Sequence, residues 1–207
     1  IYQIRGYDLA NMTLVEGKTG WIVIDPLLTA EIAKATIAFA MNGGMYGDDL
    51  KPIGYFVQNG ERLAELNRGA GDGNFYMKPN GVFYVDTKGP HVIETTKFIE
   101  GNLKDNSNFA TQSGPMLVID GKLHPAFNEG SSNMYIRSGV GIDSLGRAVF
   151  AISKQPVNFH TFASLFRDKL GCSNALYLDG AISLMYVPGI SEQKGGNFGP
   201  IIAVAKK

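Results

Sequence analysis

Asp179 is the side chain best placed in this sequence to do chemistry, because it directly follows the mostly apolar residues 174–178. Such a short apolar run is typical of a buried strand, and Gly180 lets the backbone turn sharply after the acid. A carboxylate at the end of a strand can act as a general base, as a nucleophile or as a ligand of a hard cation. The alternative is a simple turn, which is the interpretation we prefer for the similar pair Asp120-Gly121.

Asn42-Gly43-Gly44 and Arg137 could hold a ligand that carries anionic groups or hydroxyls. The two glycines permit close approach of the backbone, and successive backbone amides can form a nest for an anion. The amide of Asn42 both donates and accepts hydrogen bonds, which suits sugar hydroxyls and phosphate oxygens. The planar guanidinium of Arg137 matches phosphate with two parallel bonds. A tight turn for the first segment and a structural ion pair for Arg137 remain the alternatives.

Two serines and one histidine are candidates for orienting a substrate. Ser183 follows Asp179 within one turn's reach, and Ser113 stands in the polar turn Gln112-Ser113-Gly114 before another strand. No Gly-x-Ser-x-Gly elbow surrounds Ser113, so we favour hydrogen bonding to substrate over nucleophilic attack. His160 opens a helical pattern, where it can titrate near neutrality at the mouth of a site or simply lie at the surface.

The composition excludes several classes of function. The 207 residues, 44% hydrophobic and 18% charged, are those of a globular domain with its own core. Equal numbers of basic and acidic residues, 19 of each, argue against nucleic acid or an anionic membrane surface as the main partner. We expect no membrane span and no signal peptide. The single cysteine, Cys172, excludes an intrachain disulfide and predicts a buried thiol.

The apolar pattern predicts an α/β to α+β fold, in which mixed β-sheets pack with a few helices in one compact domain. Strands are expected at residues 1–4, 12–16, 20–25, 36–41, 53–58, 81–87, 116–120, 148–153, 174–178 and 201–205. The clearest helix spans residues 158–170, with Asn158 as its cap, and a second helix is expected over residues 30–34. We expect Arg167 to pair with a neighbour on the helix, and His91 and His124 to be exposed.

The first part of the chain resembles one enzyme family. Residues 4–13 and 20–26 are similar to the opening of the secreted alkylsulfatases of the metallo-β-lactamase superfamily. In that superfamily a His-rich zinc motif follows. This chain has only His91, His124 and His160, which are far apart and outside any such motif. Zinc hydrolysis needs several ligands around one ion, so we expect no metal cofactor and no sulfatase chemistry.

The remainder, about residues 39–207, resembles the phosphodiester glycosidases. This is the family of the lysosomal enzyme that removes N-acetylglucosamine from a sugar phosphodiester. The residues that carry the resemblance are 39–46, 73–83, 110–118, 136–141, 156–162 and 177–180. Residues 1–38 therefore read as a sulfatase-like strand-strand-helix segment within one domain. A natural or engineered mosaic, joined near residues 35–40, would explain this pattern.

The resemblance implies a hydrolase of sugar-phosphodiester (glycosyl phosphate) linkages, acting on bacterial surface glycans such as exopolysaccharides. Asp179 would be base or nucleophile, and Arg137 would hold the phosphate. The implied substrate contacts are Asn42, Gly43, Gly44, Gln112, Ser113, Gly114, His160, Gly180 and Ser183. After Asp179-Gly180 the family's glycine-rich run is replaced by Ala181-Ile182-Ser183, which resembles the bacterial branch of the family, so the resemblance does not by itself imply N-acetylglucosamine specificity.

Two alternatives stay open at this point. The chain could be a non-catalytic module that binds glycans or sugar phosphates, or an inactive mosaic. A hard cation could bind Asp179 together with backbone oxygens. Family habit predicts a periplasmic or secreted protein, with the cytoplasm as the alternative.

Overall fold

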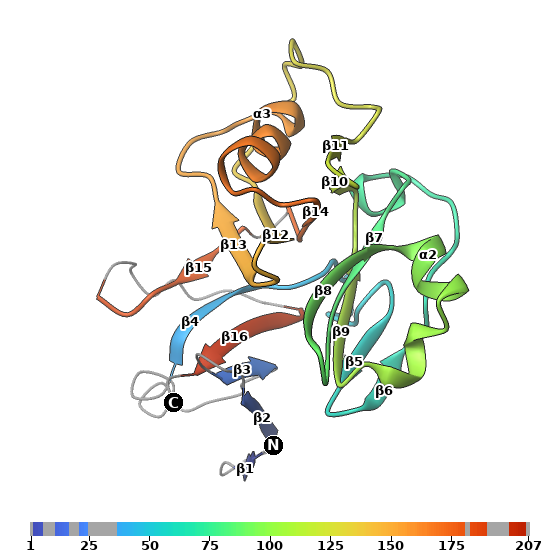
Figure 1. The fold of residues 1–207 in the computed structure, drawn as a ribbon, viewed down its shortest axis with the longest axis vertical. Helices are drawn as coiled ribbons and strands as arrows, with labels where there is room; N and C mark the ends of the chain where they lie inside the picture. The colour runs from blue at the N-terminus through green and yellow to red at the C-terminus, as the bar shows by residue number, and fades with distance from the viewer. Residues whose placement is uncertain are drawn as a thin grey trace.

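The computed structural model describes residues 2–5, 11–16, 21–24, 37–180, 183–189 and 199–205. Within them the chain forms three sheets, and every strand pairing there is antiparallel (Figure 1). A few short helices cover them. Sheets packed with a few helices confirm the predicted fold class, and the antiparallel pairing places the fold in the α+β class. None of the described helices is long and apolar enough to cross a membrane.

The first sheet joins the N-terminal strands to the rest of the molecule. Its strand order is β1-β2-β3-β16-β4-β15, with the bounds Tyr2–Arg5, Asn11–Glu16, Trp21–Ile24, Ile201–Ala205, Ile37–Asn42 and Met185–Tyr186. Ile202 in β16 pairs with Ile24 on one side and with Met41 on the other. The C-terminal strand therefore bridges the sulfatase-like segment and the glycosidase-like chain. The helix predicted over residues 30–34 lies outside the described residues.

The second and third sheets are formed by the middle of the chain. The second has the order β11-β10-β14-β12-β13, with the bounds Lys122–Leu123, Met116–Ile119, Asn174–Tyr177, Ser138–Ile142 and Ala148–Ile152. The third has the order β6-β5-β9-β7-β8, with the bounds Glu61–Ala64, Phe56–Gln58, Phe109–Ser113, Gly81–Asp86 and Gly89–Glu94. The predicted strand at 53–58 thus begins only at Phe56.

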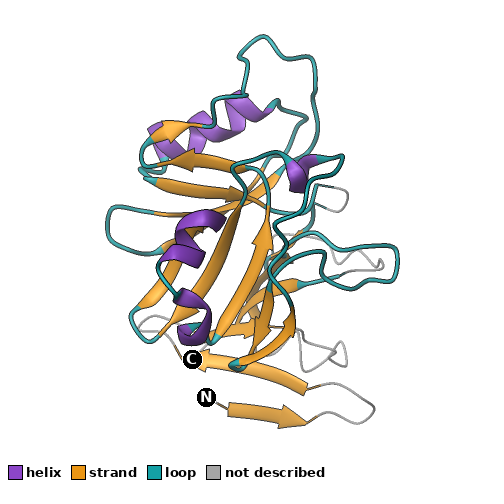
Figure 2. Cartoon of the chain, turned by 90° about the vertical axis from the view of Figure 1, so that its right-hand side faces the viewer, coloured by secondary structure: helices purple, strands orange, loops and turns teal. Residues whose placement is uncertain are grey.

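Two helical regions cover the outer faces of these sheets (Figure 2). Helix α2, Thr95–Glu100, lies on the third sheet, where Phe98 packs against Tyr55 and Val82. Helix α3, Phe159–Ser164, continues as a π-helix over Leu165–Lys169 and covers the second sheet. Short 3-10 turns stand at Asn74–Tyr76 and Leu103–Asn106.

The predicted helix at 158–170 is confirmed with its cap. The Asn158 side chain accepts a hydrogen bond of 2.8 Å from the Thr161 backbone N–H. Gly171, at φ 63°, ends the helical region in the left-handed conformation that favours glycine. Arg167 pairs with Asp168 at 2.6 Å, as expected.

All three sheets meet in one central core. Phe83 and Phe109 of the third sheet contact a cluster that includes Leu176 of the second and Ile202 of the first. Side chains alternate along a strand, so in β9 Phe109, Thr111 and Ser113 share the face toward this core. Ala110 and Gln112 point to the opposite face, the one that α2 covers. This alternation decides which of the predicted site residues can meet.

The predicted exposure of Cys172 and of His124 can be compared with the structure. Cys172 is buried, as predicted, and burial raises the pKa of its thiol to about 11. The prediction that His124 is exposed is wrong. Only 2% of His124 is accessible, because its ring stacks on Phe127 with the ring centres 4.8 Å apart. Burial lowers the pKa of this imidazole.

Candidate functional site

The ends of strands from different sheets converge at Asp179. The Asp179 backbone N–H donates to the Gly43 carbonyl oxygen at 3.0 Å, and the Leu178 N–H donates to the Ser138 oxygen at 3.0 Å. Gly43 follows β4 of the first sheet, whereas Asp179 follows β14 of the second. The residues around Asn42 and Asp179, predicted from separate parts of the sequence, are therefore adjacent in space.

The side chain of Asn42 stabilises this junction by hydrogen bonds to both sides of it. It is buried, and its Nδ2 donates to Ser138 Oγ and to the Asp179 carbonyl oxygen, both at 2.9 Å. Its Oδ1 accepts from the Leu184 N–H at 3.1 Å. Both amide protons and the amide oxygen are thus engaged within the protein. The Asn42 side chain therefore holds the backbone of Asp179 in place and has no free amide group to offer a ligand.

Two serine hydroxyls also lie against the Asp179 backbone. Ser138 Oγ is 3.4 Å and Ser183 Oγ is 3.3 Å from the Asp179 carbonyl oxygen, and the two hydroxyls are 3.3 Å apart. Ser183 was expected here from its spacing. Ser138 was missed, although it stands next to Arg137 in a segment already singled out. The signal that could have found it is its place at the start of β12, beside the end of β14.

The anion nest suggested for Gly43 and Gly44 is not open, because both amides already have acceptors. Gly43 N–H donates to the Pro200 oxygen at 2.7 Å, and Gly44 N–H donates to Thr111 Oγ1 at 3.1 Å. Glycine is nevertheless required at position 44. A Cβ added there would collide with the Gln112 carbonyl oxygen and the Thr111 hydroxyl. The segment thus serves as the tight connection between the first and third sheets.

Gln112, Ser113 and Gly114 are fully or almost fully buried at the end of β9. Gln112 Oε1 accepts from the N–H groups of Tyr55 and Asn67, each at 2.9 Å, so its amide braces a loop on the α2 side. It does not point toward Asp179. Ser113 is on the core side, with its buried Oγ unpartnered. Gly114 lies so close to Phe75 that an added Cβ would be 2.7 Å from the Phe75 oxygen.

Arg137 is buried with only 1% of its surface accessible, and its guanidinium is held by the protein. Its central carbon lies 3.6 Å from the centre of the Phe159 ring. Nε donates to the Val157 oxygen at 2.8 Å, and Nη2 donates to the Asn133 carbonyl oxygen at 2.9 Å. The guanidinium is therefore not exposed in the way that the predicted phosphate clamp would require, and its acceptors are Asn133 and Val157 rather than a carboxylate. Burial lowers the pKa of Arg137, and a hydrogen bond with Tyr177 opposes this effect.

Two tyrosines that the sequence analysis missed, Tyr46 and Tyr177, are close enough to Asp179 for its charge to affect them. Burial raises the pKa of Tyr177, the negative charge of Asp179 adds to this, and Arg137 acts in the opposite direction. A Cβ at Gly180 would collide with the Tyr177 hydroxyl, which therefore lies directly against the Asp179-Gly180 turn. Burial and the charge of Asp179 also raise the pKa of Tyr46. Both tyrosines lie within the segments 39–46 and 177–180 that carry the family resemblance, and only the fold brings them near enough for the charge of Asp179 to raise their pKa values.

The remaining candidate, His160, lies partly exposed in the first turn of α3. Its role in substrate binding stays a prediction. In the part of the chain that the structure describes, no three His, Cys, Asp or Glu side chains gather as a metal-binding group.

The model of the family described as phosphodiester glycosidase matches residues 35–201. The chain belongs to this family. A relative in Escherichia coli (strain K12), the uncharacterized protein YigE, is 38% identical over 169 residues. The alignment covers 82% of this chain and 65% of the relative, so this phosphodiester glycosidase domain spans less than two thirds of the relative's own length.

Two solved structures share the fold of this phosphodiester glycosidase domain. One is the zebrafish N-acetylglucosamine-1-phosphodiester alpha-N-acetylglucosaminidase catalytic domain, auto-inhibited by its pro-peptide, with a TM-score of 0.58 and 15% identity over 84% of this chain and 65% of that one. The other is a hypothetical protein from Synechocystis, with a TM-score of 0.52 and 14% identity over 95% of this chain and 62% of that one. At these identities the likeness concerns the fold alone.

The resemblance of the N-terminal residues to alkylsulfatases is also confirmed. The linear primary-alkylsulfatase of Pseudomonas sp is 60% identical over 37 residues, which are 18% of this chain and 6% of that enzyme. These strands join the glycosidase domain through β16, as described above. The origin of the chain as a mosaic stays a prediction.

Proposed function

We propose that this domain hydrolyses sugar-phosphodiester linkages and that Asp179 is its base or nucleophile. The observation that carries the proposal is the position of Asp179. Only 6% of Asp179 is accessible, its backbone is fixed by Asn42 and Gly43, and its charge is close enough to Tyr46 and Tyr177 to raise their pKa values. An acid that is buried and held rigidly where the first and second sheets meet is typical of a catalytic group.

The reaction needs little acid assistance, because the phosphate monoester that departs is already a good leaving group. In one route Asp179 takes a proton from water while the water oxygen attacks the anomeric carbon. In the other the carboxylate attacks that carbon itself, and water then hydrolyses the glycosyl ester. In both, the bond from carbon to the phosphate oxygen breaks and its electron pair leaves with the phosphate.

The other site residues would support these steps from within the protein. The raised pKa values of Tyr46 and Tyr177 keep both phenols protonated at neutral pH, so that each can donate a hydrogen bond beside the acid. Arg137 would orient Tyr177 from behind instead of clamping the phosphate directly. Ser138 and Ser183 would hold the Asp179 backbone. The exopolysaccharide-type substrate and the periplasmic or secreted location belong to the same proposal.

The test is hydrolysis of the methyl phosphodiester of N-acetylglucosamine 1-phosphate and of its glucose analogue by the purified chain. Asp179→Asn is expected to lower kcat by about 100-fold or more, since a general base contributes about this much. Asp120→Asn is the matched control. It changes the same Asp-Gly dipeptide at an exposed turn, where Asp120 pairs with Lys97 on the surface and contacts Asn174. Equal activity of Asp179→Asn and the parent, or binding without turnover by the parent, would favour a non-catalytic sugar-phosphate-binding module.

A further inference from the structure

A pocket lies on the side of the third sheet that faces away from Asp179. Its volume is about 620 Å³, within the range of about 300–1,000 Å³ common for small-molecule sites. Neighbouring residues of β9 show that the pocket and the surroundings of Asp179 lie on opposite faces of the third sheet. The Gln112 side chain donates to Thr95 Oγ1 at 3.3 Å in the wall of this pocket, whereas the preceding side chain, Thr111, accepts from Gly44 on the core side.

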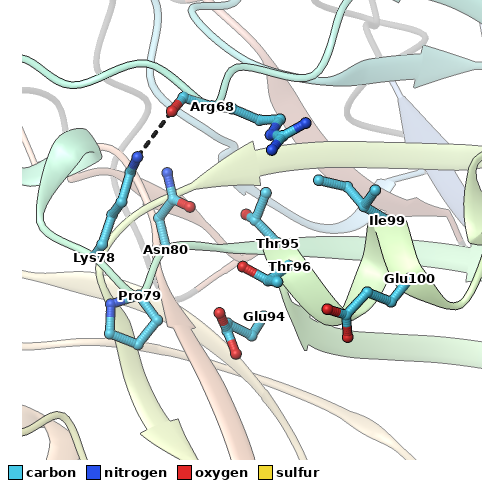
Figure 3. A pocket seen from close by; sticks show the side chains of 9 residues that line it. All are labelled: Arg68, Lys78, Pro79, Asn80, Glu94, Thr95, Thr96, Ile99 and Glu100. Carbon is cyan, nitrogen blue, oxygen red and sulfur yellow. Dashed lines mark hydrogen bonds between the residues drawn. The ribbon is translucent and has the colours of Figure 1, made fainter.

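The charges of this pocket are divided between two opposite sides (Figure 3). Arg68 and Lys78 lie along one side, and the carboxylates of Glu94 and Glu100 lie along the other. No ion pair within 4.0 Å joins these two cations to these two anions. Lys78 Nζ instead donates to the Arg68 carbonyl oxygen at 2.8 Å. The pocket therefore keeps opposite charges apart and leaves room between them.

The floor between the charged sides is polar and rigid. Asn80 and Thr95 are 4% and 6% accessible. The Thr95 N–H donates to the Asn80 carbonyl oxygen at 3.0 Å, and Asn80 Nδ2 donates to the Phe75 oxygen at 3.1 Å. Thr95 Oγ1 accepts from Gln112, so its own proton can be donated to a ligand. Ile99 adds an apolar surface to one end of the pocket.

We propose that this pocket binds a short zwitterionic peptide, with its carboxylate toward Arg68 and Lys78 and its ammonium toward Glu94 and Glu100. A ligand with two separated charges satisfies both sides at once, while Asn80 and Thr95 hydrogen-bond its peptide groups. A neutral sugar could hydrogen-bond to both sides but would leave their charges without counter-charges. A sugar phosphate would place its negative charge in a pocket that also contains two carboxylates. The proposal is independent of the proposed hydrolytic activity.

The experiment is isothermal titration calorimetry of the whole chain with trialanine, which carries both terminal charges, and with N-acetyl-trialanine amide, which carries neither. Trialanine is expected to bind, more weakly at 0.5 M than at 0.05 M NaCl, and the blocked peptide is expected to bind at least about tenfold more weakly. Arg68→Ala and Glu100→Gln are each expected to weaken trialanine binding by about tenfold. Both side chains are exposed, so circular dichroism should report an unchanged fold.

Lys88→Ala and Glu61→Gln remove exposed charges outside the pocket and serve as matched controls. Absence of trialanine binding, equal binding of the two peptides, or equal loss in the control variants would overturn the proposal. Tighter binding of N-acetylglucosamine 1-phosphate than of trialanine, abolished by Arg68→Ala, would also overturn it in favour of a sugar-phosphate subsite. None of these outcomes depends on turnover at Asp179.

Discussion

Asn42 Nδ2 donates to the carbonyl oxygen of Asp179 at 2.9 Å, across 137 positions of sequence. The same amide contacts Ser138 and the Leu184 N–H, so one side chain joins the ends of two sheets to the segment after the acid. Removing it leaves buried polar groups without partners, which is more costly than losing the bonds alone. The geometry of the acid therefore depends on a residue that has no free group to offer a substrate.

Asn42→Ala is accordingly expected to lower the free energy of unfolding by about 2–3 kcal/mol, as measured by urea denaturation. It should also reduce kcat more than it raises KM, because the acid is displaced while other substrate contacts remain. Asn128→Ala is the matched control. Asn128 accepts one bond from Gly130 in an exposed turn, and its loss should cost about 0.5 kcal/mol or less. A similar effect of both variants would contradict the role assigned to Asn42.

Arg137→Lys tests whether Arg137 has a structural role beside Tyr177 or binds the phosphate directly. A lysine can neither stack its charge on Phe159 as a plane nor reach Val157 and Asn133 together. We expect a loss of about 2–4 kcal/mol in the free energy of unfolding. Arg147→Lys should cost about 0.5 kcal/mol or less, because Arg147 pairs with Asp143 at the surface. If Arg137→Lys kept full stability but lost only affinity for sugar phosphate, Arg137 would be a substrate clamp after all.

Tyr46→Phe removes a hydroxyl whose pKa is raised by burial and by the charge of Asp179, without emptying the core. Tyr46 is only partly buried, so the change should alter the free energy of unfolding by about 0.5 kcal/mol or less. The proposed function has this hydroxyl donate a hydrogen bond near Asp179, so its loss should lower kcat by about tenfold or more. Tyr135→Phe, at a tyrosine that is 58% exposed, is the control for removing a phenolic hydroxyl. Unchanged kcat in Tyr46→Phe would remove Tyr46 from the mechanism.

Asp179 and the Asn42-Gly43 segment that contacts it could both be found from the sequence, because each is identified by the residues directly around it. Asp179 and Asn42 both come at the end of short apolar runs that favour buried strands, although the run before Asn42 could also have continued a helix. The directions of Arg137 and Gln112 were not predictable, because residue type does not show which neighbours a side chain will have. Arg137 is buried by Phe159, which comes from a helix 22 positions later in the sequence. Strands β9 and β12 were missed since Gly, Ser, Thr and Gln dilute their apolar pattern.

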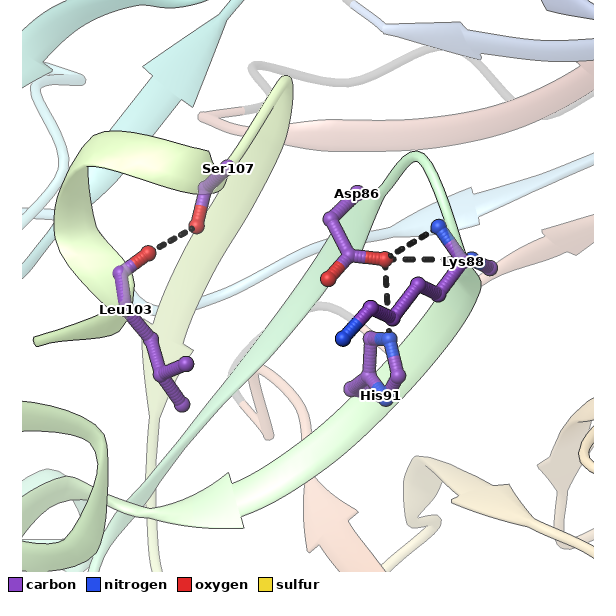
Figure 4. Close-up of polar contacts among 6 residues, drawn as sticks. Asp86, Lys88, His91, Leu103 and Ser107 are labelled. Atoms are coloured by element: carbon purple, nitrogen blue, oxygen red, sulfur yellow. Dashed lines mark hydrogen bonds and ion pairs between the residues drawn. The ribbon is translucent and has the colours of Figure 1, made fainter. Parts of the chain in front are cut away.

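Asp86 makes part of the stability dependent on pH (Figure 4). Burial alone would raise the pKa of this carboxyl. The hydrogen bond from His91 at 3.0 Å and those from the Lys88 and Gly89 amides outweigh burial and lower the pKa below its ordinary value of 3.8. Because the folded state favours the ionised form, this stabilisation is present above about pH 4 and is lost as the pH falls through the folded-state pKa.

Asp86→Asn should therefore be less stable than the parent at pH 7, and the difference should shrink toward zero on acidification below about pH 4. Urea denaturation of both proteins at pH 7, 5, 4 and 3 measures this. Asp72→Asn, at an exposed loop position, should show no such trend. A stability difference for Asp86→Asn that stays constant from pH 7 to pH 3 would mean that the carboxylate charge does not matter.

Gly44→Ala tests the close contact between the first and third sheets. A Cβ there would collide with backbone and with the Thr111 side chain, and a backbone carbonyl cannot swing aside as a flexible side chain could. We expect a loss of about 3 kcal/mol or more in the free energy of unfolding, or failure to fold. Gly130→Ala is the matched control, because a Cβ there would be 3.7 Å from Asn128 Oδ1, an ordinary contact. Its stability should equal or slightly exceed that of the parent, since alanine restricts the unfolded chain more than glycine does. If Gly44→Ala were as stable as Gly130→Ala, the two sheets could separate at this point, and Asp179 would not be held as rigidly as its proposed role requires.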